Sequence, residues 1–198
     1  MPRLLLASRR IPGLAGLLGA RGRRALLVPS AANPLEEPEI ADEVERELTA
    51  AGLDVERLDL DEATPIQMRA LAAADVLAVS GGDPFHLLAA ARRTGFEDAA
   101  RDALAGGAVY VGYSAGAMVA GPTLEPLLWT SPFSPPAGLD LTGLRIAEVL
   151  VLPHHDRPGR AERHAAAQAA FAGRVRLEPL RDGELVVQEG ARISVLRH

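Results

Sequence analysis

The sequence contains no cysteine. Disulfide bonds, thiolate metal sites and a cysteine nucleophile are therefore excluded, while the redox compartment of the protein stays open. A surplus of basic residues is missing as well, because 21 Lys and Arg stand against 26 Asp and Glu and give a formal net charge of −5. General binding to nucleic acid needs cations that neutralise phosphates, so we expect no nucleic-acid partner.

Long apolar runs are also lacking. The N-terminal Leu4-Leu5-Leu6 is soon followed by Arg9 and Arg10, and the apolar residues 14–20 include two glycines. A signal peptide needs one apolar core of roughly 7–15 residues, and a membrane span needs about 18. We therefore expect a cytoplasmic protein without a membrane partner.

The size and apolar content of the chain favour one globular domain. Its 198 residues are 48% apolar, which is enough to build a full core. No internal repeat, linker or change of composition divides the sequence. We therefore expect a single domain over residues 1–198.

Apolar strand patterns alternate with helical patterns along the chain. Strands are expected at 3–7, 25–29, 55–60, 76–79, from 109, and at 149–152, 174–177, 184–188 and 193–196. Helices are expected at 38–51, 65–74, 84–93, 96–104 and 159–171, with a helix or loop at 11–19. This alternation predicts an α/β fold with a mostly parallel sheet and helices on both faces. Such sheets carry their sites at the carboxyl ends of the strands.

One of these strand ends carries a nucleophile pattern. The strand from Val109 leads into Gly112-Tyr113-Ser114-Ala115-Gly116, and small residues that suit a helix follow. A strand, a tight turn and a helix around Gly-x-Ser-x-Gly form a nucleophile elbow, which projects the serine hydroxyl away from the backbone. Ser114 is therefore the candidate nucleophile. The alternative is an ordinary glycine-rich turn with a serine that faces solvent.

A serine nucleophile needs a base, and histidine is the usual one. His154 and His155 follow the strand at 149–152, and we expect them at the same sheet edge as Ser114. The alternatives are a loop that only caps the strand, or a metal site. Adjacent histidines normally point apart and no further ligands cluster nearby, so we expect no metal. His86 and His164 fall within predicted helices and are expected at the surface.

Backbone N–H groups could stabilise an oxyanion at this edge. Ala115 follows the nucleophile directly, and Gly82 lies in the turn Ser80-Gly81-Gly82-Asp83 at the end of another strand. Glycine permits a close approach to a ligand. In the same turn, Asp83 is a candidate N-cap of the helix at 84–93, and the two interpretations are compatible.

Two further segments bear on binding. Arg157, Arg160 and Arg163 stand three residues apart, a spacing that places residues on one face where the chain is helical. Arg160 would hold a substrate carboxylate there, and the alternative is a solvated basic surface. The irregular segment 122–143 contains Trp129 and Phe133. These two side chains either are exposed, which would favour a homodimer, or fold inward over the site.

Five stretches of the chain together resemble a known family. They are residues 3–8, 80–85, 112–117, 153–154 and 160–163. In this order they resemble peptidase E, the family of aspartyl dipeptidases, and its relatives the cyanophycinases, over nearly the whole chain. The match of Gly112 to Ala117 to the family motif Gly-x-Ser-Ala-Gly-Ala is the most specific part.

The resemblance implies a fold, an activity and a set of site residues. The fold would be similar to the class I glutamine amidotransferases, and the activity would be hydrolysis of dipeptides with an N-terminal aspartate, without metal or cofactor. Ser114 would be the nucleophile and His154 the base. Gly82 and Ala115 would form the oxyanion hole. Arg160 would recognise the aspartyl side chain of a small peptide substrate, with Asp83 and His155 also expected beside it.

The third member of the triad departs from the family pattern. Peptidase E has an aspartate about fifteen residues after the serine, but residues 127–132 of this chain contain no acid. Glu125 is the nearest acid on that segment and is the favoured candidate. Asp140 and Asp156 are the alternatives. The role of this acid is to orient the imidazole and to stabilise its cation.

Two other functions remain open on the same residues. One is a related hydrolase for another acidic or β-aspartyl substrate. The other is a protein that binds an acidic ligand without catalysis, on a fold that has lost its acid.

Overall fold

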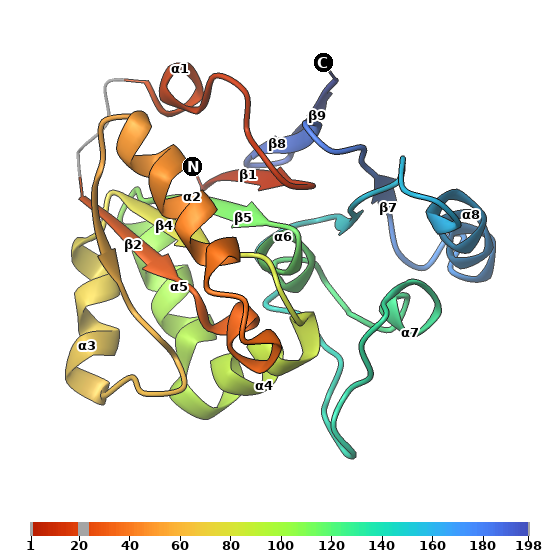
Figure 1. The fold of residues 1–198 in the computed structure, drawn as a ribbon, viewed down its shortest axis with the longest axis horizontal. Helices are drawn as coiled ribbons and strands as arrows, with labels where there is room; N and C mark the ends of the chain where they lie inside the picture. Colours follow the sequence, from red (N-terminus) through yellow and green to blue (C-terminus); the bar gives the residue numbers. More distant parts are fainter. Residues whose placement is uncertain (1, 20–23, 198) are drawn as a thin grey trace.

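The computed structural model describes residues 2–19 and 24–197. Its main sheet consists of β1 (Arg3–Ala7), β2 (Arg24–Val28), β3 (Asp54–Arg57), β4 (Val76–Val79), β5 (Val109–Tyr113), β8 (Leu185–Glu189) and β9 (Arg192–Leu196). The strand order is β3-β2-β4-β5-β1-β8-β9, and the chain runs through it as Figure 1 shows. The first five strands pair in parallel, whereas β8 and β9 join in antiparallel pairs. The predicted mostly parallel sheet is confirmed.

A second, two-stranded sheet stands apart from the first. Its strands are β6 (Leu150–Leu152) and β7 (Leu177–Pro179), which pair in parallel with Leu152 opposite Pro179. The prediction that the strand before His154 lies in the main sheet is therefore wrong. Beside β1 the main sheet has β5 on one side and β8 on the other, and β6 instead pairs with β7. The strand expected at 174–177 also begins three residues later than predicted.

Apart from one helix in the segment 122–143, the helices lie where the sequence patterns place them, with small changes at their ends. They are α1 (Leu14–Leu18), α2 (Glu39–Ala50), α3 (Pro65–Ala70), α4 (Pro84–Thr94), α5 (Phe96–Ala105), α6 (Ala115–Val119), α7 (Leu127–Thr130) and α8 (Arg160–Ala170). The helix predicted at 65–74 divides into α3 and a 3-10 turn at 71–73. Over residues 2–19 and 24–197, no helix is long and apolar enough to cross a membrane.

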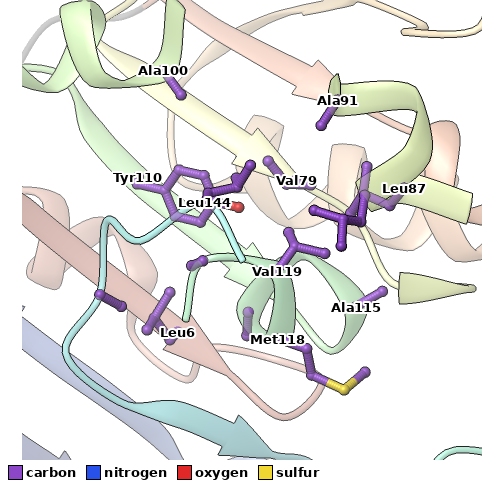
Figure 2. Close-up of a cluster of buried hydrophobic side chains, with 14 of the residues drawn as sticks. Leu6, Val79, Leu87, Ala91, Ala100, Tyr110, Ala115, Met118, Val119 and Leu144 are labelled. Atoms are coloured by element: carbon purple, nitrogen blue, oxygen red, sulfur yellow. The ribbon is translucent and has the colours of Figure 1, made fainter. Parts of the chain in front are cut away.

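The alternation of side chains along β1 separates two apolar cores. Leu4 and Leu6 point to the face covered by α3, α4, α5 and α6, whereas Leu5 and Ala7 point to the face covered by α1 and α2. Successive residues of a strand face opposite sides of the sheet, so each strand contributes to both cores. Figure 2 shows the first core, where Leu6 and Tyr110 of the sheet lie near Met118 and Val119 of α6. Helices thus cover both faces, as predicted.

The segment 122–143 is irregular, as predicted, except for α7 and an isolated bridge between Thr123 and Thr142. Trp129 on α7 remains 54% exposed, while Phe133 packs partly buried against the main core. Figure 1 shows α7, α8 and β7 gathered beyond the carboxyl ends of the parallel strands. The segment therefore folds over the strand ends with Phe133 but leaves Trp129 outside.

Candidate active site

Ser114 lies on a strained turn between β5 and α6. Its backbone has φ 46° and ψ −104°, although it is not glycine, and its N–H donates to Ala7 O at 2.9 Å. The turn needs small neighbours. A Cβ at Gly112 would lie 2.7 Å from Gly116 O, and a Cβ at Gly116 would lie 2.3 Å from Val79 O. These close contacts explain why glycine stands on both sides of the serine.

His154 contacts Ser114 from the second sheet. It follows β6, and its Nε2 lies 3.1 Å from Ser114 Oγ. Its backbone φ is +62°. Ser114 and His154 are thus two of the four non-glycine residues with positive φ in the described part of the chain. Such strain concentrates at functional sites, because only the surrounding structure can hold it. The structure thus brings together the serine and the histidine that the sequence singles out.

Asp182 completes this array. It follows β7, and its Oδ1 lies 2.6 Å from His154 Nδ1. Arg157 donates to its Oδ2 at 2.9 Å, and Ser8 Oγ donates to its Oδ1 at 2.8 Å. Because β6 and β7 run parallel, the residues that follow them lie at the same end of the small sheet. A carboxylate on Nδ1 fixes the tautomer that leaves Nε2 free to accept a proton.

The expectation that Glu125 holds the histidine is wrong. Glu125 is exposed, and its carboxylate lies 3.4 Å from Arg174. Asp140 is also exposed and accepts from the N–H and hydroxyl of Thr142. Asp156 lies closer, but its Oδ1 accepts from Asp182 N at 3.2 Å. Asp182 therefore takes the position for which these three residues were the candidates.

The charges of the array are set by burial and hydrogen bonds. Burial opposes the charged form of Asp182, but hydrogen bonds from Arg157, His154 and Ser8 outweigh it and lower its pKa to about 2. Burial also lowers the pKa of His154 below 6.5, although the contact with Asp182 acts in the opposite direction. At neutral pH the array therefore consists of a carboxylate, a neutral imidazole and a hydroxyl.

The two predicted oxyanion donors are the N–H of Ala115, which follows Ser114, and the N–H of Gly82, which lines the same cavity as Ser114. Among the described residues, neither Ala115 N nor Gly82 N donates a hydrogen bond to another protein group. Gly82 has φ +137°, and a Cβ there would lie 2.0 Å from Ala31 O, so a side chain does not fit. The turn that contains Gly81 and Gly82 lies close to the serine, since a Cβ on Gly81 would lie 3.4 Å from Ser114 Cβ.

A cavity of about 390 Å³ opens beside Ser114. Its wall comes from the loop after β1, the segment 35–47 with α2, the glycine turn, the segment after α7 and the start of α8. The lining residues are Arg9, Leu35, Glu37, Ile40, Glu43, Val44, Glu47, Gly81, Gly82, Tyr113, Ser114, Met118, Thr130, Ser131, Pro132, Phe133, Pro153, His154, Arg157, Arg160 and His164. The wall carries both acidic and basic side chains, and its volume suits a small ligand.

Most of the basic side chains in the wall come from α8 and the loop before it, and Arg9 comes from the loop after β1. Arg160 donates to Thr130 O. Burial lowers the pKa of the Arg160 guanidinium, and the nearby charges of Arg163 and Arg157 lower it further. His164 is only 1% exposed, so the expectation that it lies at the surface is wrong. Burial and the surrounding cationic groups lower its pKa to about 4.

Two residues expected beside the substrate lie elsewhere. Asp83 caps α4, where its Oδ1 accepts from Phe85 N at 2.8 Å and His86 N at 3.3 Å. His155 is not among the residues that line the cavity, and its Nδ1 lies 3.1 Å from Nδ1 of His164. The described residues hold no group of three or more His, Asp or Glu that could bind a metal ion.

Comparisons with known proteins agree on one family. Residues 8–196 match the family model described as Peptidase family S51. The peptidase E of Salmonella arizonae is 33% identical over 153 residues, which cover 73% of this chain and 65% of that protein. An uncharacterized peptidase of Listeria monocytogenes, Lmo0363, is 25% identical over 181 residues, or 89% of this chain and 87% of the relative.

Two solved structures share the fold. A Listeria monocytogenes EGD-e protein, provisionally assigned as a peptidase E, matches with a TM-score of 0.88 at 22% identity, over 100% of this chain and 99% of its own. A peptidase from an acI-B1 Actinobacterium matches with a TM-score of 0.74 at 20% identity, over 99% of this chain and 87% of its own. At these identities the likeness establishes the fold.

Proposed function

Because this chain belongs to peptidase family S51, we propose that it is a serine dipeptidase that hydrolyses dipeptides with an N-terminal aspartate. The observation that carries the proposal is the array of Ser114, His154 and Asp182, with contacts of 3.1 Å and 2.6 Å, at a cavity that Arg160 also lines. The roles given to these residues follow from their chemistry and their positions.

In the proposed mechanism, Ser114 Oγ attacks the carbonyl carbon of the aspartyl residue while His154 Nε2 accepts the proton of the serine hydroxyl. The N–H groups of Ala115 and Gly82 stabilise the oxyanion of the tetrahedral intermediate. His154 then gives the proton to the leaving amine, and an aspartyl ester forms on Ser114. Water, activated by the same histidine, hydrolyses the ester. Asp182 stabilises the imidazolium in both steps.

The proposed preference for aspartate is supported by the basic side chains in the wall. Arg160 is partly buried and lines the cavity that contains Ser114. Arg157 forms a salt bridge with Asp182, whereas no carboxylate among the described residues pairs with Arg160. A planar guanidinium binds a carboxylate with two hydrogen bonds. A substrate carboxylate is the counter-charge that this part of the wall lacks.

Arg160→Ala is expected to lower kcat/KM for Asp-Leu by about 100-fold, the size of effect that follows from losing charge-assisted hydrogen bonds. Hydrolysis of Asn-Leu, which has the same shape without the charge, should change little. The measurement is the ratio of kcat/KM values for Asp-Leu, Asn-Leu and Glu-Leu in the wild type and the variant. Arg163→Ala is the matched control, because Arg163 is exposed and its Nε donates to the carbonyl of Gly159, the residue before α8.

A preference for Asn-Leu or Ala-Leu in the wild type would contradict the aspartate proposal and favour a different hydrolase. Cleavage of β-linked but not α-linked Asp-Leu would assign the enzyme to β-aspartyl substrates. Binding of Asp-Leu without turnover would favour a binding protein on the same fold.

The acidic limb of the pH profile of kcat/KM is expected to have its midpoint below pH 6.5, the ordinary pKa of histidine. Only neutral His154 can accept the serine proton, and burial lowers its pKa, so activity persists above that lowered value and is lost as the pH falls through it. Initial rates of Asp-Leu hydrolysis between about pH 4 and pH 8 measure this midpoint.

Loss of folding is the control for this profile. His164, with a pKa of about 4, is buried in its neutral form, so its contribution to stability is complete above pH 6.5 and declines as the pH falls toward 4. Circular dichroism at each pH separates unfolding from protonation of His154. A midpoint above pH 6.5 in folded protein would contradict the dominance of burial at His154.

A further inference from the structure

Ser8 lies where the two sheets meet. It directly follows β1, the strand of the main sheet that lies between β5 and β8, and it is fully buried. Its N–H donates to Glu184 O at 3.1 Å, which fixes its backbone beside the segment that follows Asp182. The mechanism proposed above gives this buried hydroxyl no role.

The side chain of Ser8 joins two of the proposed catalytic residues. Its Oγ donates to Asp182 Oδ1 at 2.8 Å and accepts from the backbone N–H of His154 at 2.8 Å. The same oxygen lies 3.5 Å from His154 Nδ1. One hydroxyl thus uses its donor on the carboxylate and its acceptor on the histidine backbone, and both contacts are short.

The end of β1 also holds the third residue of the array. The carbonyl of Ala7, next to Ser8, accepts from Ser114 N at 2.9 Å. Two consecutive residues therefore contact Ser114, His154 and Asp182, which come from segments far apart in the sequence.

The array needs such a link because its parts belong to different sheets. Ser114 follows β5 in the main sheet, whereas His154 and Asp182 follow β6 and β7 in the small one. No strand ladder among the described residues connects the two sheets. In addition, His154 has a φ of +62°, a conformation that a non-glycine residue keeps only when its surroundings hold it. The hydrogen bond from His154 N to Ser8 Oγ holds the backbone at that residue.

We propose that Ser8 is a positioning residue, whose hydroxyl holds the Asp182 carboxylate and the His154 backbone in the geometry that lets His154 reach Ser114. The inference rests on the proposed serine mechanism and adds to it a residue that acts through the triad without touching substrate. Its removal should impair the chemical step and leave substrate binding intact.

Ser8→Ala is expected to lower kcat for Asp-Leu by about 10- to 100-fold, the loss that follows when a hydrogen bond to a charged group is removed. KM should change by less than about threefold, because the interaction serves the chemical step. Ser8→Cys is the second variant. It keeps nearly the shape of serine but hydrogen-bonds weakly, so a similar loss of kcat would assign the effect to the hydrogen bonds and not to a cavity.

The chain offers a closely matched control in Ser30. This serine is also fully buried, and its Oγ donates to Asp59 Oδ1 at 2.9 Å and accepts from Leu60 N at 2.7 Å. It makes the same pair of hydrogen bonds away from the cavity. Ser30→Ala should therefore lower the unfolding temperature about as much as Ser8→Ala does, and it should leave kcat unchanged.

A double-mutant cycle with Asp182→Asn tests whether Ser8 acts through the triad. If it does, Ser8→Ala costs much less kcat in the Asp182→Asn background than in the wild type. An equal loss in both backgrounds would overturn the proposal, as would equal kcat losses in Ser8→Ala and Ser30→Ala, or a wild-type kcat in Ser8→Ala.

These results are separate from a failure of the proposed function. If the wild type hydrolyses Asp-Leu and Ser8→Ala does so equally well, only the role of Ser8 is wrong. If the wild type does not hydrolyse Asp-Leu, the proposed function fails, and the role given to Ser8 fails with it.

Discussion

Asp182→Asn is expected to lower kcat for Asp-Leu by about 10⁴-fold, the loss known for the same change in a serine triad. An amide keeps the shape of the carboxylate, but it cannot stabilise the imidazolium, and it favours the tautomer with the proton on the wrong nitrogen. The 2.6 Å contact between Asp182 Oδ1 and His154 Nδ1 carries this expectation. The measurement is kcat for Asp-Leu, with circular dichroism to establish that the variant folds.

Glu125→Gln is the control for this prediction. Its carboxylate is exposed and faces Arg174 at 3.4 Å, and a surface ion pair of this kind contributes little. The variant should retain wild-type activity and stability. If Glu125→Gln lost activity and Asp182→Asn kept it, the assignment of the acid would be wrong.

Ser114→Ala is expected to lower kcat by about 10⁶-fold, because removing the nucleophile of a triad costs about as much as removing the whole triad. Binding should survive, since the change deletes one hydroxyl from the wall of the cavity. Calorimetry with Asp-Leu should therefore still detect binding to the variant.

Ser194→Ala is the control for the nucleophile. Ser194 lies on β9, and its hydroxyl donates to Val187 O, away from the cavity. Its kcat should match that of the wild type. Turnover by Ser114→Ala at a tenth of the wild-type rate or more would exclude Ser114 as the nucleophile.

Local patterns predicted the parts of the structure that local physics decides. The apolar runs that became β1 and β4 have the predicted bounds, because a strand buried on both faces reads as a continuous apolar run. The pattern Gly-x-Ser-x-Gly indicated the turn at Ser114, since only glycine fits at positions 112 and 116, where a Cβ would meet backbone atoms.

The position of Asp182 could not be predicted in the same way. The strand before Asp182 is expected at 174–177 but lies at 177–179. Asp182 reaches His154 because β7 pairs with β6, and no local pattern reports which strands pair. One sequence signal could have indicated Asp182: it is an acid that follows a short strand, and such a strand could pair in parallel with the strand before His154.

The burial of His164 also depends on contacts distant in sequence. Its neighbours on α8 are largely alanine and polar residues, which is typical of a surface helix. However, α7 packs against α8, and the segment after α7 closes over the same cavity that His164 lines. An irregular segment of this length gives no sequence signal for where it folds.

The most direct test of the triad is the reaction of the intact chain with a fluorophosphonate, followed by peptide mass spectrometry. We predict one adduct, on Ser114, with a labelling rate that falls sharply in Asp182→Asn and stays unchanged in Glu125→Gln. Absence of an adduct from Ser114 in the folded wild type, or equal labelling of Ser114 in the wild type and Asp182→Asn, would contradict activation of this serine by His154 and Asp182.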